Sequence, residues 1–476
     1  MWRRLPAADR WVLRHLGATD TRALSVLPPL GRAANYGRLW WGVSAALAAT
    51  GNRRARRAAL RGLISLGAAS FAANVVSKQV VRRPRPPIEL TPVARRLARI
   101  PVTTSFPSGH SASAAAFAAG VAIESPLLAV PVGLLAAGVG ASRVVTGVHY
   151  PTDVLAGFAL GLGAGALTTW WWPATPAGPA EAAPVAAPAA PNGEGVVVVV
   201  NSHAGSTGNG LLDLLREQLP EAEIVQPEDG EDLVEVLEAA ARRCRILGIA
   251  GGDGSINVAA KTAADHGIPL FALPGGTLNH FARDLGLDDP HEAISALQAG
   301  AASQVDLGCV DERGFVNTCS TGLYTDLVRY REKWERRLGK WPAMLVGLVH
   351  VLRRAQPQDL VVDGRPRRVW MVFAGNGRYL PVGFAPTSRP RLDDGLLDIR
   401  IMDAARPLAR TRIALSVLLG TLRWSGPYEG TTAQELKLSA PDGLLYLTLD
   451  GEFTRVDPEV TITKRPRALT VYRPRR

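Results

Sequence analysis

Five apolar runs, separated by short polar insertions, fill most of the first 172 residues. The runs cover residues 39–50, 63–76, 112–123, 127–145 and 154–172. Several are shorter than the roughly 20 residues that a full crossing usually needs, so the pattern predicts membrane helices without fixing their number. We therefore predict an all-α, multi-pass bundle in the cell membrane over residues 1–172.

The polar segments at the start of this region carry mostly arginine. Residues 53–61 hold five arginines and predict a short basic loop on the cytoplasmic side. Residues 1–38 are amphipathic, and Trp11, Val12 and Leu16 fit a helix that lies along a membrane surface. A signal peptide has an apolar core followed by a cleavage site. The N-terminus does not show this pattern, so we expect no signal peptide.

A change of composition separates the two halves of the chain. Residues 173–195 are mainly proline and alanine with few charges. Such chain is typical of an extended, semi-rigid spacer that has nothing to bury. We therefore predict a linker and a domain boundary here.

Beyond the linker, short apolar runs alternate with helical periodicity. Runs predicted to be buried parallel strands cover 196–200, 246–250 and 269–273, and helices are expected over 211–219 and 233–244. The second and third strands each run into a glycine-rich loop. This pattern predicts a doubly wound α/β nucleotide-binding domain over residues 196–310, with ligands at the carboxyl ends of the strands.

Residues 311–476 change to alternating patterns typical of strands. The expected strands cover 360–362, 369–373, 396–402, 435–438, 444–449 and 460–463, and a short helix is expected over 343–352. Asp363-Gly364 separates the first two strands, which is a hairpin signal. We predict a second, β-sandwich domain.

Charge and cysteine content narrow the function only slightly. The net charge of +12 suits nucleic acid, anionic lipid or phosphate substrates. Because the arginines are spread along the chain, we disfavour nucleic acid as a partner. The cysteines Cys244, Cys309 and Cys319 show neither metal nor disulfide spacing, which fits a reducing compartment.

Residues 142–153, Ser-Arg-Val-Val-Thr-Gly-Val-His-Tyr-Pro-Thr-Asp, place charged groups between two apolar runs. Charge this close to hydrocarbon is costly and usually marks a site. One chemistry suits the set: His149 attacks phosphorus, Asp153 holds its ring, and Arg143 binds phosphate oxygens. The alternative is a polar loop between two membrane helices, with Asp153 as an N-cap.

Two further polar insertions precede this stretch. Lys78 is followed by six residues and then Arg85-Pro86, and residues 105–111 read Ser-Phe-Pro-Ser-Gly-His-Ser. In this order, the three insertions resemble the type 2 phosphatidic acid phosphatase superfamily over about residues 40–172.

This resemblance implies roles that phosphate chemistry also requires. Phosphate would be bound by Lys78, Arg85, Ser108, the backbone at Gly109, and Arg143. His149 would become phosphohistidine, Asp153 would accept its other ring N–H, and His110 would protonate the departing oxygen. No metal or other cofactor is needed for this half.

Counting crossings places the three insertions on one face of the membrane. With residues 53–61 inside, successive crossings put 78–105 and 143–149 outside. The phosphatase site is therefore expected on the outer face and the second half of the chain in the cytoplasm. The same count places the arginine-rich residues 1–38 outside. This conflicts with the tendency of positively charged segments to stay in the cytoplasm.

The two glycine loops would let backbone N–H groups approach the phosphates of a nucleotide. They read Gly251-Gly252-Asp253-Gly254-Ser255-Ile256-Asn257 and Pro274-Gly275-Gly276-Thr277-Leu278-Asn279-His280. Neither follows the Gly-x-Gly-x-x-Gly or the lysine-bearing P-loop pattern, and the first alone would fit an ordinary turn. Together they resemble the catalytic domain of the lipid kinase superfamily that includes diacylglycerol and sphingosine kinases, over about residues 195–476.

The lipid kinase resemblance implies an ATP site and use of Mg²⁺. The ATP-binding residues would be Asn201, Gly251, Gly252, Asp253, Gly254, Ser255, Asn257, Thr277 and Asn279. The sequence departs from the family at Ser255, where threonine is usual, at Val258, where an acidic residue is common, and at residues 278–280, where Gly-Asn-Asp is usual. These departures leave the lipid and the details of nucleotide geometry open.

Two Asp-Gly segments in the β-rich part gain roles only through the resemblance. It implies that Asp450 is the base on the lipid hydroxyl, with Glu452 as its neighbour. It also implies that Asp394 belongs to a structural magnesium site, helped by backbone carbonyls. From spacing alone both segments would be hairpin turns.

The leading interpretation is a bifunctional membrane enzyme: a phosphohistidine-dependent lipid phosphate phosphatase fused to an ATP- and Mg²⁺-dependent lipid kinase. Its partners would be lipid phosphates, lipid alcohols and membrane lipids, and a homo-oligomer stays open. One alternative is a membrane-tethered kinase of a soluble metabolite, similar to an NAD kinase. Another is a kinase whose first half is a non-catalytic anchor, flippase or sensor.

Overall fold

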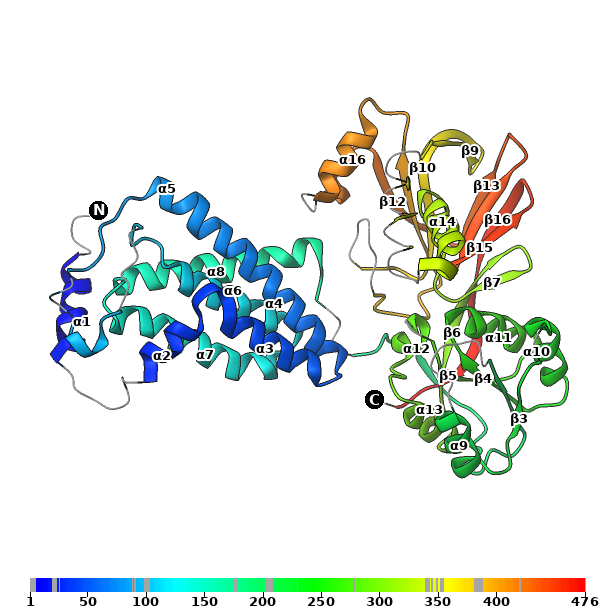
Figure 1. The fold of residues 1–476 in the computed structure, drawn as a ribbon. Coiled ribbons are helices and arrows are strands. Elements are labelled where there is room, and N and C mark those ends of the chain that lie inside the picture. The colour runs from blue at the N-terminus through cyan, green and yellow to red at the C-terminus, as the bar shows by residue number, and fades with distance from the viewer. Residues whose placement is uncertain are drawn as a thin grey trace. The chain divides into compact units, whose positions relative to one another are not determined.

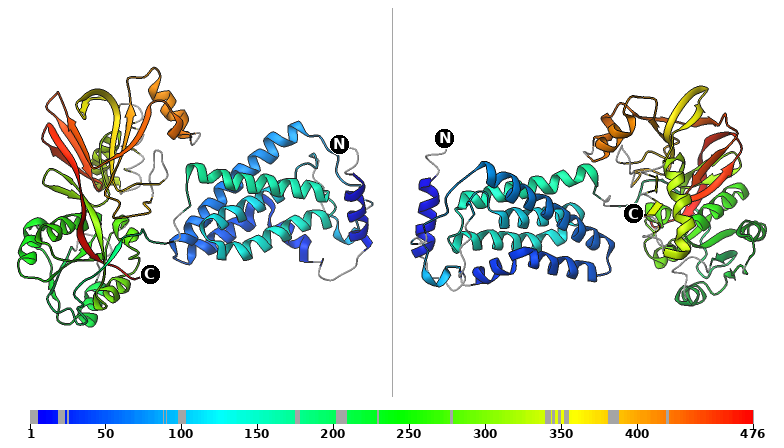
Figure 2. Two further views of the ribbon diagram at one scale, coloured as in Figure 1. Left: turned by 180° about the vertical axis from the view of Figure 1, so that it is seen from behind. Right: turned by 45° about the horizontal axis from the view of Figure 1, so that its top comes forward.

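A computed structural model describes residues 6–18, 24, 26–87, 89, 91–97, 103–174, 178–201, 209–228, 230–276, 279–338, 343, 346–347, 350–351, 355–380, 388–418 and 421–475. The chain forms two compact units, Met1–Thr175 and Pro176–Arg476. The first unit is helical, and the second combines a mixed sheet with helices (Figures 1 and 2).

The first unit is a helical bundle. Its elements are α1 (Pro6–Ala18), α2 (Leu27–Ala33), η2 (Asn35–Gly37), α3 (Arg38–Ala49), α4 (Arg53–Phe71), η3 (Ala72–Ser77), α5 (Lys78–Val80), η5 (Val93–Arg95), α6 (Gly109–Glu124), α7 (Pro126–Val145) and α8 (Pro151–Trp171). Among the described residues, three helices are long and apolar enough to cross a membrane: Arg53–Val80, Pro126–Val145 and Pro151–Trp170. The predicted all-α bundle is confirmed, and three of its helices could span a membrane.

The prediction of a basic loop over residues 53–61 is wrong, because these residues form the first turns of α4. Asn52 caps the helix, since its Oδ1 accepts a hydrogen bond from the backbone N–H of Arg54 at 2.8 Å. Arginine is itself a good helix former. The cluster of arginines is therefore compatible with a continuous helix.

Two of these arginines are held by a buried carboxylate. The Nε atoms of Arg57 and Arg61 lie 2.8 and 2.7 Å from the two oxygens of Glu124, at the end of α6. The side chains of Arg61 and Glu124 are fully buried. The ring of Trp172 lies 4.3 and 4.7 Å from the two guanidinium groups, so the cluster joins the ends of α4, α6 and α8.

The contact between α6 and α8 depends on glycine. Gly157, Gly161 and Gly165 recur every fourth residue on α8 and therefore share one helix face. A Cβ on Gly161 would lie 2.3 Å from the carbonyl oxygen of Ala112, and a Cβ on Gly157 would lie 2.5 Å from that of Ser108. Small residues at this spacing let helix backbones approach closely. The glycines thus bring α8 against the start of α6.

We expect Gly161→Leu to force α8 away from α6 and to lower the free energy of unfolding by at least about 1–3 kcal/mol, the usual cost of overpacking. Thermal unfolding of the purified chain in detergent measures this. Gly163→Leu is the matched control on the same helix, because nothing lies within 4 Å of a Cβ there. Equal unfolding temperatures for the two variants would contradict the close α6–α8 contact.

The second unit begins with an α/β part. Its elements are β1 (Ala183–Ala186), β2 (Val196–Val200), α9 (Asn209–Gln218), β3 (Glu223–Val225), α10 (Leu233–Ala241), β4 (Ile246–Gly251), α11 (Asp253–His266), β5 (Leu270–Pro274), α12 (His280–Leu285), α13 (Pro290–Gln298) and β6 (Ala301–Val310). Strands β3, β2, β4 and β5 pair in parallel in that order, and every residue of β2 is buried. The predicted α/β nucleotide-binding fold is confirmed.

A β-rich part follows. Its elements are β7 (Arg313–Phe315), β8 (Thr318–Gly322), α14 (Leu323–Leu338), β9 (Gln358–Val362), β10 (Arg365–Asn376), β11 (Leu397–Asp403), α16 (Ala409–Leu418), η6 (Leu422–Trp424), β12 (Tyr428–Ala433), β13 (Glu435–Ser439), β14 (Leu445–Leu449), β15 (Glu452–Val456) and β16 (Glu459–Tyr472). The predicted hairpin at Asp363-Gly364 joins β9 to β10, with φ of 47° and 75° at the two turn residues. The sandwich is confirmed. Half of the helix expected over 343–352 lies outside the described residues.

The last strand belongs to both parts of the second unit (Figure 1). Strand β16 pairs with β13 in the sandwich, then with β6, and finally runs parallel to β5 through Val471 and Leu270. Leu469, Val471 and Tyr472 are buried in the core of the α/β part. The boundary predicted at residue 310 therefore does not divide the chain into two consecutive folding units.

The prediction of a spacer with nothing to bury over residues 173–195 is wrong for the described residues beyond 178. Strand β1 pairs with β6, while Ala180 and Ala190 are buried in the α/β core. The hydroxyl of Tyr472 donates a hydrogen bond to the carbonyl oxygen of Pro188 at 2.6 Å. Proline and alanine suit this role because an edge strand tolerates a missing N–H and small side chains pack flat against the sheet.

Candidate functional sites

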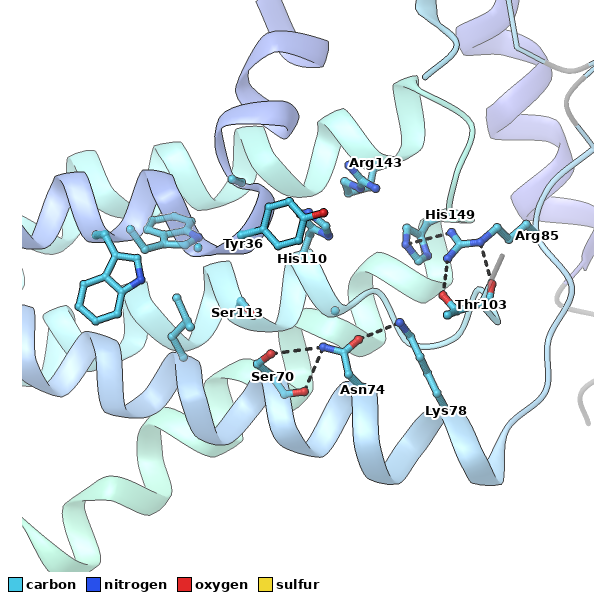
Figure 3. Close-up of a pocket in the computed structure, with 16 residues that line it drawn as sticks. Tyr36, Ser70, Asn74, Lys78, Arg85, Thr103, His110, Ser113, Arg143 and His149 are labelled. Carbon is cyan, nitrogen blue, oxygen red and sulfur yellow. Dashed lines mark hydrogen bonds between the residues drawn. The ribbon is translucent and has the colours of Figure 1, made fainter. Parts of the chain in front are cut away.

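A cavity of about 510 Å³ lies in the first unit (Figure 3). Its basic lining residues are Lys78, Arg85, His110, Arg143 and His149, and its apolar lining includes Trp40, Trp41 and Leu66. One wall of the cavity is a helical face that carries Leu66, Ser70, Asn74 and Lys78 in that order. The character of this wall therefore changes from apolar to basic along the helix. Such a cavity fits an amphiphile with an anionic head. The structure thus brings residues of all three polar insertions together.

His149 presents one ring nitrogen to this cavity. Its Nδ1–H donates a hydrogen bond to the carbonyl oxygen of Ser105 at 2.7 Å, which leaves the lone pair on Nε2. Nε2 lies 3.4 Å from Nη1 of Arg85. Burial lowers the pKa of His149, so the ring is held in its neutral, nucleophilic form.

Asp153 supports His149 less directly than predicted. Its Oδ2 lies 3.7 Å from His149 Nδ1, so the predicted hydrogen bond is not formed at this distance. Instead, Oδ2 accepts hydrogen bonds from the Ser105 hydroxyl and from the Tyr150 N–H. Asp153 therefore orients Ser105, whose carbonyl holds the histidine.

The cavity's cations are held by different groups. Arg85 donates to the carbonyl oxygens of Val148 and Thr103, at 2.7 and 2.9 Å. Lys78 donates to Asn74 Oδ1 at 2.8 Å (Figure 3). The Nε of buried Arg143 has no hydrogen-bond partner within the described chain. Its donor is available for an anion.

The second insertion contributes Gly109 and His110 to the cavity but not the Ser108 side chain. The Ser108 hydroxyl accepts hydrogen bonds from Ser111, as the N-cap of α6. The Nε2–H of His110 donates to Asn35 Oδ1 at 2.8 Å. Ser108 therefore shapes the start of α6, which presents Gly109 to the cavity, and its phosphate-binding role stays a prediction.

In the second unit, the two glycine loops meet at the carboxyl ends of β4 and β5. A Cβ on Gly276 would lie 2.6 Å from the Cα of Gly252, and Gly275 N–H donates to the carbonyl oxygen of Gly251 at 2.9 Å. The first loop opens α11, whose free N–H groups favour anions. This backbone cradle fits the phosphates of a nucleotide.

The polar residues predicted around this cradle divide into two groups. Asn201 Nδ2 donates to Ser255 Oγ at 2.9 Å, and Asn279 Oδ1 accepts from Gly276 N–H at 2.8 Å. These side chains lie at the loops. Asn257 instead donates to the carbonyl oxygen of Gly314 at 3.0 Å and joins α11 to β7. Asp253 lies at the first turn of α11, and Thr277 lies outside the described residues.

Asp450 and Glu452 have different surroundings. The carboxylate of Asp450 accepts hydrogen bonds from the N–H groups of Val316, Asn317 and Thr318 at 2.7–2.8 Å. Burial raises its pKa to about 6. Glu452 reaches the nucleotide loop, because its Oε1 lies 1.9 Å from the place that a Cβ would take on Gly254. Asp450 therefore holds the segment before β8, whereas Glu452 lies at the first glycine loop; the role of Asp450 as the base stays a prediction.

Models of known families match three parts of the chain. The PAP2 superfamily matches residues 58–176, the diacylglycerol kinase catalytic domain matches residues 195–310, and the YegS C-terminal NAD kinase beta sandwich-like domain matches residues 321–473. A probable lipid kinase YegS-like from Pseudomonas aeruginosa is 31% identical over 47% of this chain and 76% of its own length. The chain joins a PAP2 domain to a lipid kinase of the diacylglycerol kinase family.

Two further proteins match one half each. A diacylglycerol kinase from Bacillus subtilis is 30% identical to the kinase over 45% of this chain and 74% of its own length. The crystal structure of a transmembrane PAP2 type phosphatidylglycerolphosphate phosphatase from Bacillus subtilis is 27% identical over 35% of this chain and 84% of its own, with a TM-score of 0.28.

The PAP2 domain uses residues that the sequence did not reveal. Arg83 bridges Asp153 Oδ1 and Asp9 Oδ2, each at 2.7 Å, and Asp9 also accepts from the hydroxyl of Thr152 at 2.7 Å. Asp9 is 1% exposed and lies on α1, so the first helix packs beside the site. Asn35 likewise orients His110. No local pattern marks such contacts, because the partners are 70 to 143 residues apart.

In the kinase, the surroundings of Asp394 do not fit a magnesium ion. Its carboxylate accepts hydrogen bonds from the N–H groups of Arg378 and Leu396. The ammonium of Lys464 lies 3.6 Å from Asp394 Oδ1 and 3.2 Å from Asp306 Oδ2. Within the described part of the chain, no three His, Cys, Asp or Glu residues form a metal-binding group. The ammonium of buried Lys464 thus lies beside the carboxylate that the family resemblance assigns to a magnesium site.

We expect Lys464→Met to lower the free energy of unfolding of the kinase by about 3–5 kcal/mol, because buried Asp306 and partly buried Asp394 would lose their cation. Thermal unfolding of the full chain in nanodiscs measures this. Lys437→Met is the control, since this lysine pairs with Glu435 at the surface with 63% of its side chain exposed, and should change stability by less than about 0.5 kcal/mol. Equal losses in both variants would show that Lys464 does not neutralise the pair.

Proposed function

We propose that the PAP2 domain hydrolyses a lipid phosphate through a phosphohistidine on His149. The observation that carries this is the neutral ring, with Nδ1–H on Ser105 and the lone pair of Nε2 beside Arg85 in a basic cavity. Nε2 attacks phosphorus, the bond to the lipid oxygen breaks, and His110 gives that oxygen a proton. Water then attacks the phosphohistidine and releases inorganic phosphate.

The cations act where charge develops. Arg85, Arg143 and Lys78 neutralise the phosphate oxygens as the transition state gains charge. The apolar lining, which includes Trp40, Trp41 and Leu66, accommodates the lipid chain. Phosphatidate, isoprenoid phosphates and phosphatidylglycerol phosphate all suit a cavity of this kind.

We propose that the second unit transfers the γ-phosphoryl group of ATP, bound as its magnesium complex, to a lipid alcohol such as diacylglycerol. The backbone N–H groups of the glycine cradle bind the phosphates of the nucleotide substrate. Glu452 accepts the proton of the lipid hydroxyl as its oxygen attacks phosphorus. Asp450 holds the loop that precedes β8.

The two sites are proposed to face opposite sides of the membrane. The site residues gather at one end of the first unit, beside α1 and the α7–α8 connection, while Arg57, Arg61 and Glu124 gather where α8 ends. The positive-inside tendency puts the arginine cluster and the kinase that follows α8 in the cytoplasm. The phosphatase site then opens outside.

The experiment that tests both functions uses the purified chain in nanodiscs with two radiolabels. With ATP labelled on the γ-phosphate, Mg²⁺ and diacylglycerol, we expect labelled phosphatidate. Without ATP, a labelled lipid phosphate should release inorganic phosphate. The NAD-kinase alternative predicts that NAD competes for the label, and the anchor alternative predicts no phosphate release. Either result would overturn the corresponding half of the proposal.

The pH dependence of phosphate release follows from His149. Because burial lowers the pKa of His149 below its ordinary value of about 6.5, the neutral nucleophile persists in mild acid. On the acid side of the profile, we expect kcat/KM to fall as the pH drops through this lowered pKa, because protonated His149 cannot attack phosphorus. A profile measured across mildly acidic to neutral pH, with stability checked at each point, tests this. An acid limb centred above about 6.5 would contradict it.

A further inference from the structure

The segment between β11 and β12 carries apolar side chains on its exposed side. Helix α16 stands at the edge of the sandwich (Figure 1), where Ile413 and Leu422 pack into a buried cluster. Leu408, Leu415 and Trp424 point outward, and are 75%, 53% and 62% exposed. These three large side chains have no apolar cover in the described chain.

The same segment is basic. Residues 404–428 contain four arginines and no acidic residue. The arginines Arg406, Arg410, Arg412 and Arg423 are all exposed. The flanking Glu429 is already paired with Arg367 at 2.5 Å. We call the exposed residues Arg406, Leu408, Arg410, Arg412, Leu415, Arg423 and Trp424 the α16 surface.

Two of these arginines converge. Arg412 Nη2 and Arg406 Nη1 lie 3.1 and 3.3 Å from the place that a Cβ would take on Gly426. No ion pair to either arginine is found among the described residues. Two like charges held this close favour an anion between them. Beside them, Leu408 adopts φ of +54°, a conformation uncommon for a bulky residue, with its side chain in solvent.

We propose that the α16 surface docks the kinase onto an anionic lipid bilayer. Arg406 and Arg412 bind a lipid phosphate, while Leu408, Leu415 and Trp424 enter the boundary between headgroups and acyl chains. Arginine beside exposed leucine and tryptophan is the composition of interfacial membrane-binding segments. The charge favours a bilayer over a protein partner, because every charge on the α16 surface is positive.

Covalent linkage makes this docking attainable. The kinase follows directly after a unit with three candidate membrane spans, so it is never far from a bilayer. Docking would place the sandwich at the lipid surface. The glycine cradle would stay accessible to the nucleotide. The proposal concerns a surface and not turnover, so it can be tested whether or not the kinase substrate is correctly assigned.

The test places an environment-sensitive label on the full chain in nanodiscs, as Leu408→Cys, with half-buried Cys244 replaced by serine. Asp442→Cys, at the exposed β13–β14 turn, is the control site. In discs containing phosphatidylglycerol, we expect the label at 408 to be quenched by acyl-chain quenchers at least about threefold more than the label at 442. Phosphatidylcholine alone or high salt should abolish the difference.

Charge removal completes the test. Arg406→Gln and Arg412→Gln should each reduce the docked fraction about fivefold, since each basic residue near an anionic surface contributes to binding. Equal quenching at positions 408 and 442 in anionic discs would overturn the proposal. So would equal quenching in neutral and anionic discs. A label at 408 that is shielded from water but not quenched by lipid would also overturn it, and would indicate a protein partner.

Discussion

His149→Gln should abolish phosphate release from lipid phosphates, with a loss of at least about 10⁴-fold in kcat/KM, and leave phosphatidate synthesis by the kinase unchanged. Glutamine keeps the size and polarity of the side chain but provides no nucleophile for phosphorus. The measurement is release of labelled inorganic phosphate in nanodiscs, with kinase activity assayed in the same preparation.

His110→Gln gives the matched comparison within the same cavity. Its proposed role is to protonate the departing oxygen, so an aryl phosphate with a good leaving group should restore much of its activity. The same substrate should not rescue His149→Gln. If the aryl phosphate rescued both variants equally, or if His149→Gln retained phosphate release, the nucleophile would be wrongly assigned.

Glu452→Gln should lower the kcat of the kinase by about 10²–10⁴-fold, with little change in KM for ATP and in unfolding temperature. The amide still fills the space at Gly254 but cannot accept the proton of the lipid hydroxyl. Steady-state kinetics with diacylglycerol and thermal unfolding separate these effects. Glu435→Gln is the control, because this carboxylate is half-exposed and pairs with Lys437 at the surface.

Asp450→Asn should lower the stability of the kinase as well as its activity. An amide nitrogen in place of one carboxylate oxygen would face backbone N–H groups that need an acceptor, so the variant should lose about 1–3 kcal/mol of stability together with its activity. If Asp450→Asn were as stable as the wild type yet inactive, while Glu452→Gln stayed active, Asp450 would be the base.

The sequence predicted the membrane bundle, the α/β fold and the sandwich because each has a local periodicity. It also predicted that residues of the three insertions lie together, since the insertions fall at the ends of apolar runs, but not that Ser70 and Asn74 line the same cavity. It could not predict the Asp9–Arg83–Asp153 network, whose members lie far apart in the chain. Nor could it predict that Lys464 faces Asp394.

Two predictions were wrong because the amino-acid composition of each segment fits more than one structure. Residues rich in proline and alanine suit a spacer and equally an edge strand, and β1 is the latter. A cluster of arginines suits a loop and equally the first turns of a helix, as α4 shows. In both cases the deciding contact came from a distant segment.

The course of β16 sets the order in which the protein can become active during synthesis. The core beneath the nucleotide loops includes Leu469 and Val471, which are synthesised long after β2 of the same core. The kinase can therefore finish folding only after β16 has left the ribosome, whereas the helices of the first unit are made hundreds of residues earlier. If the ribosome stalled before residue 469, the helical bundle could still fold. The nucleotide-binding domain attached to it could not.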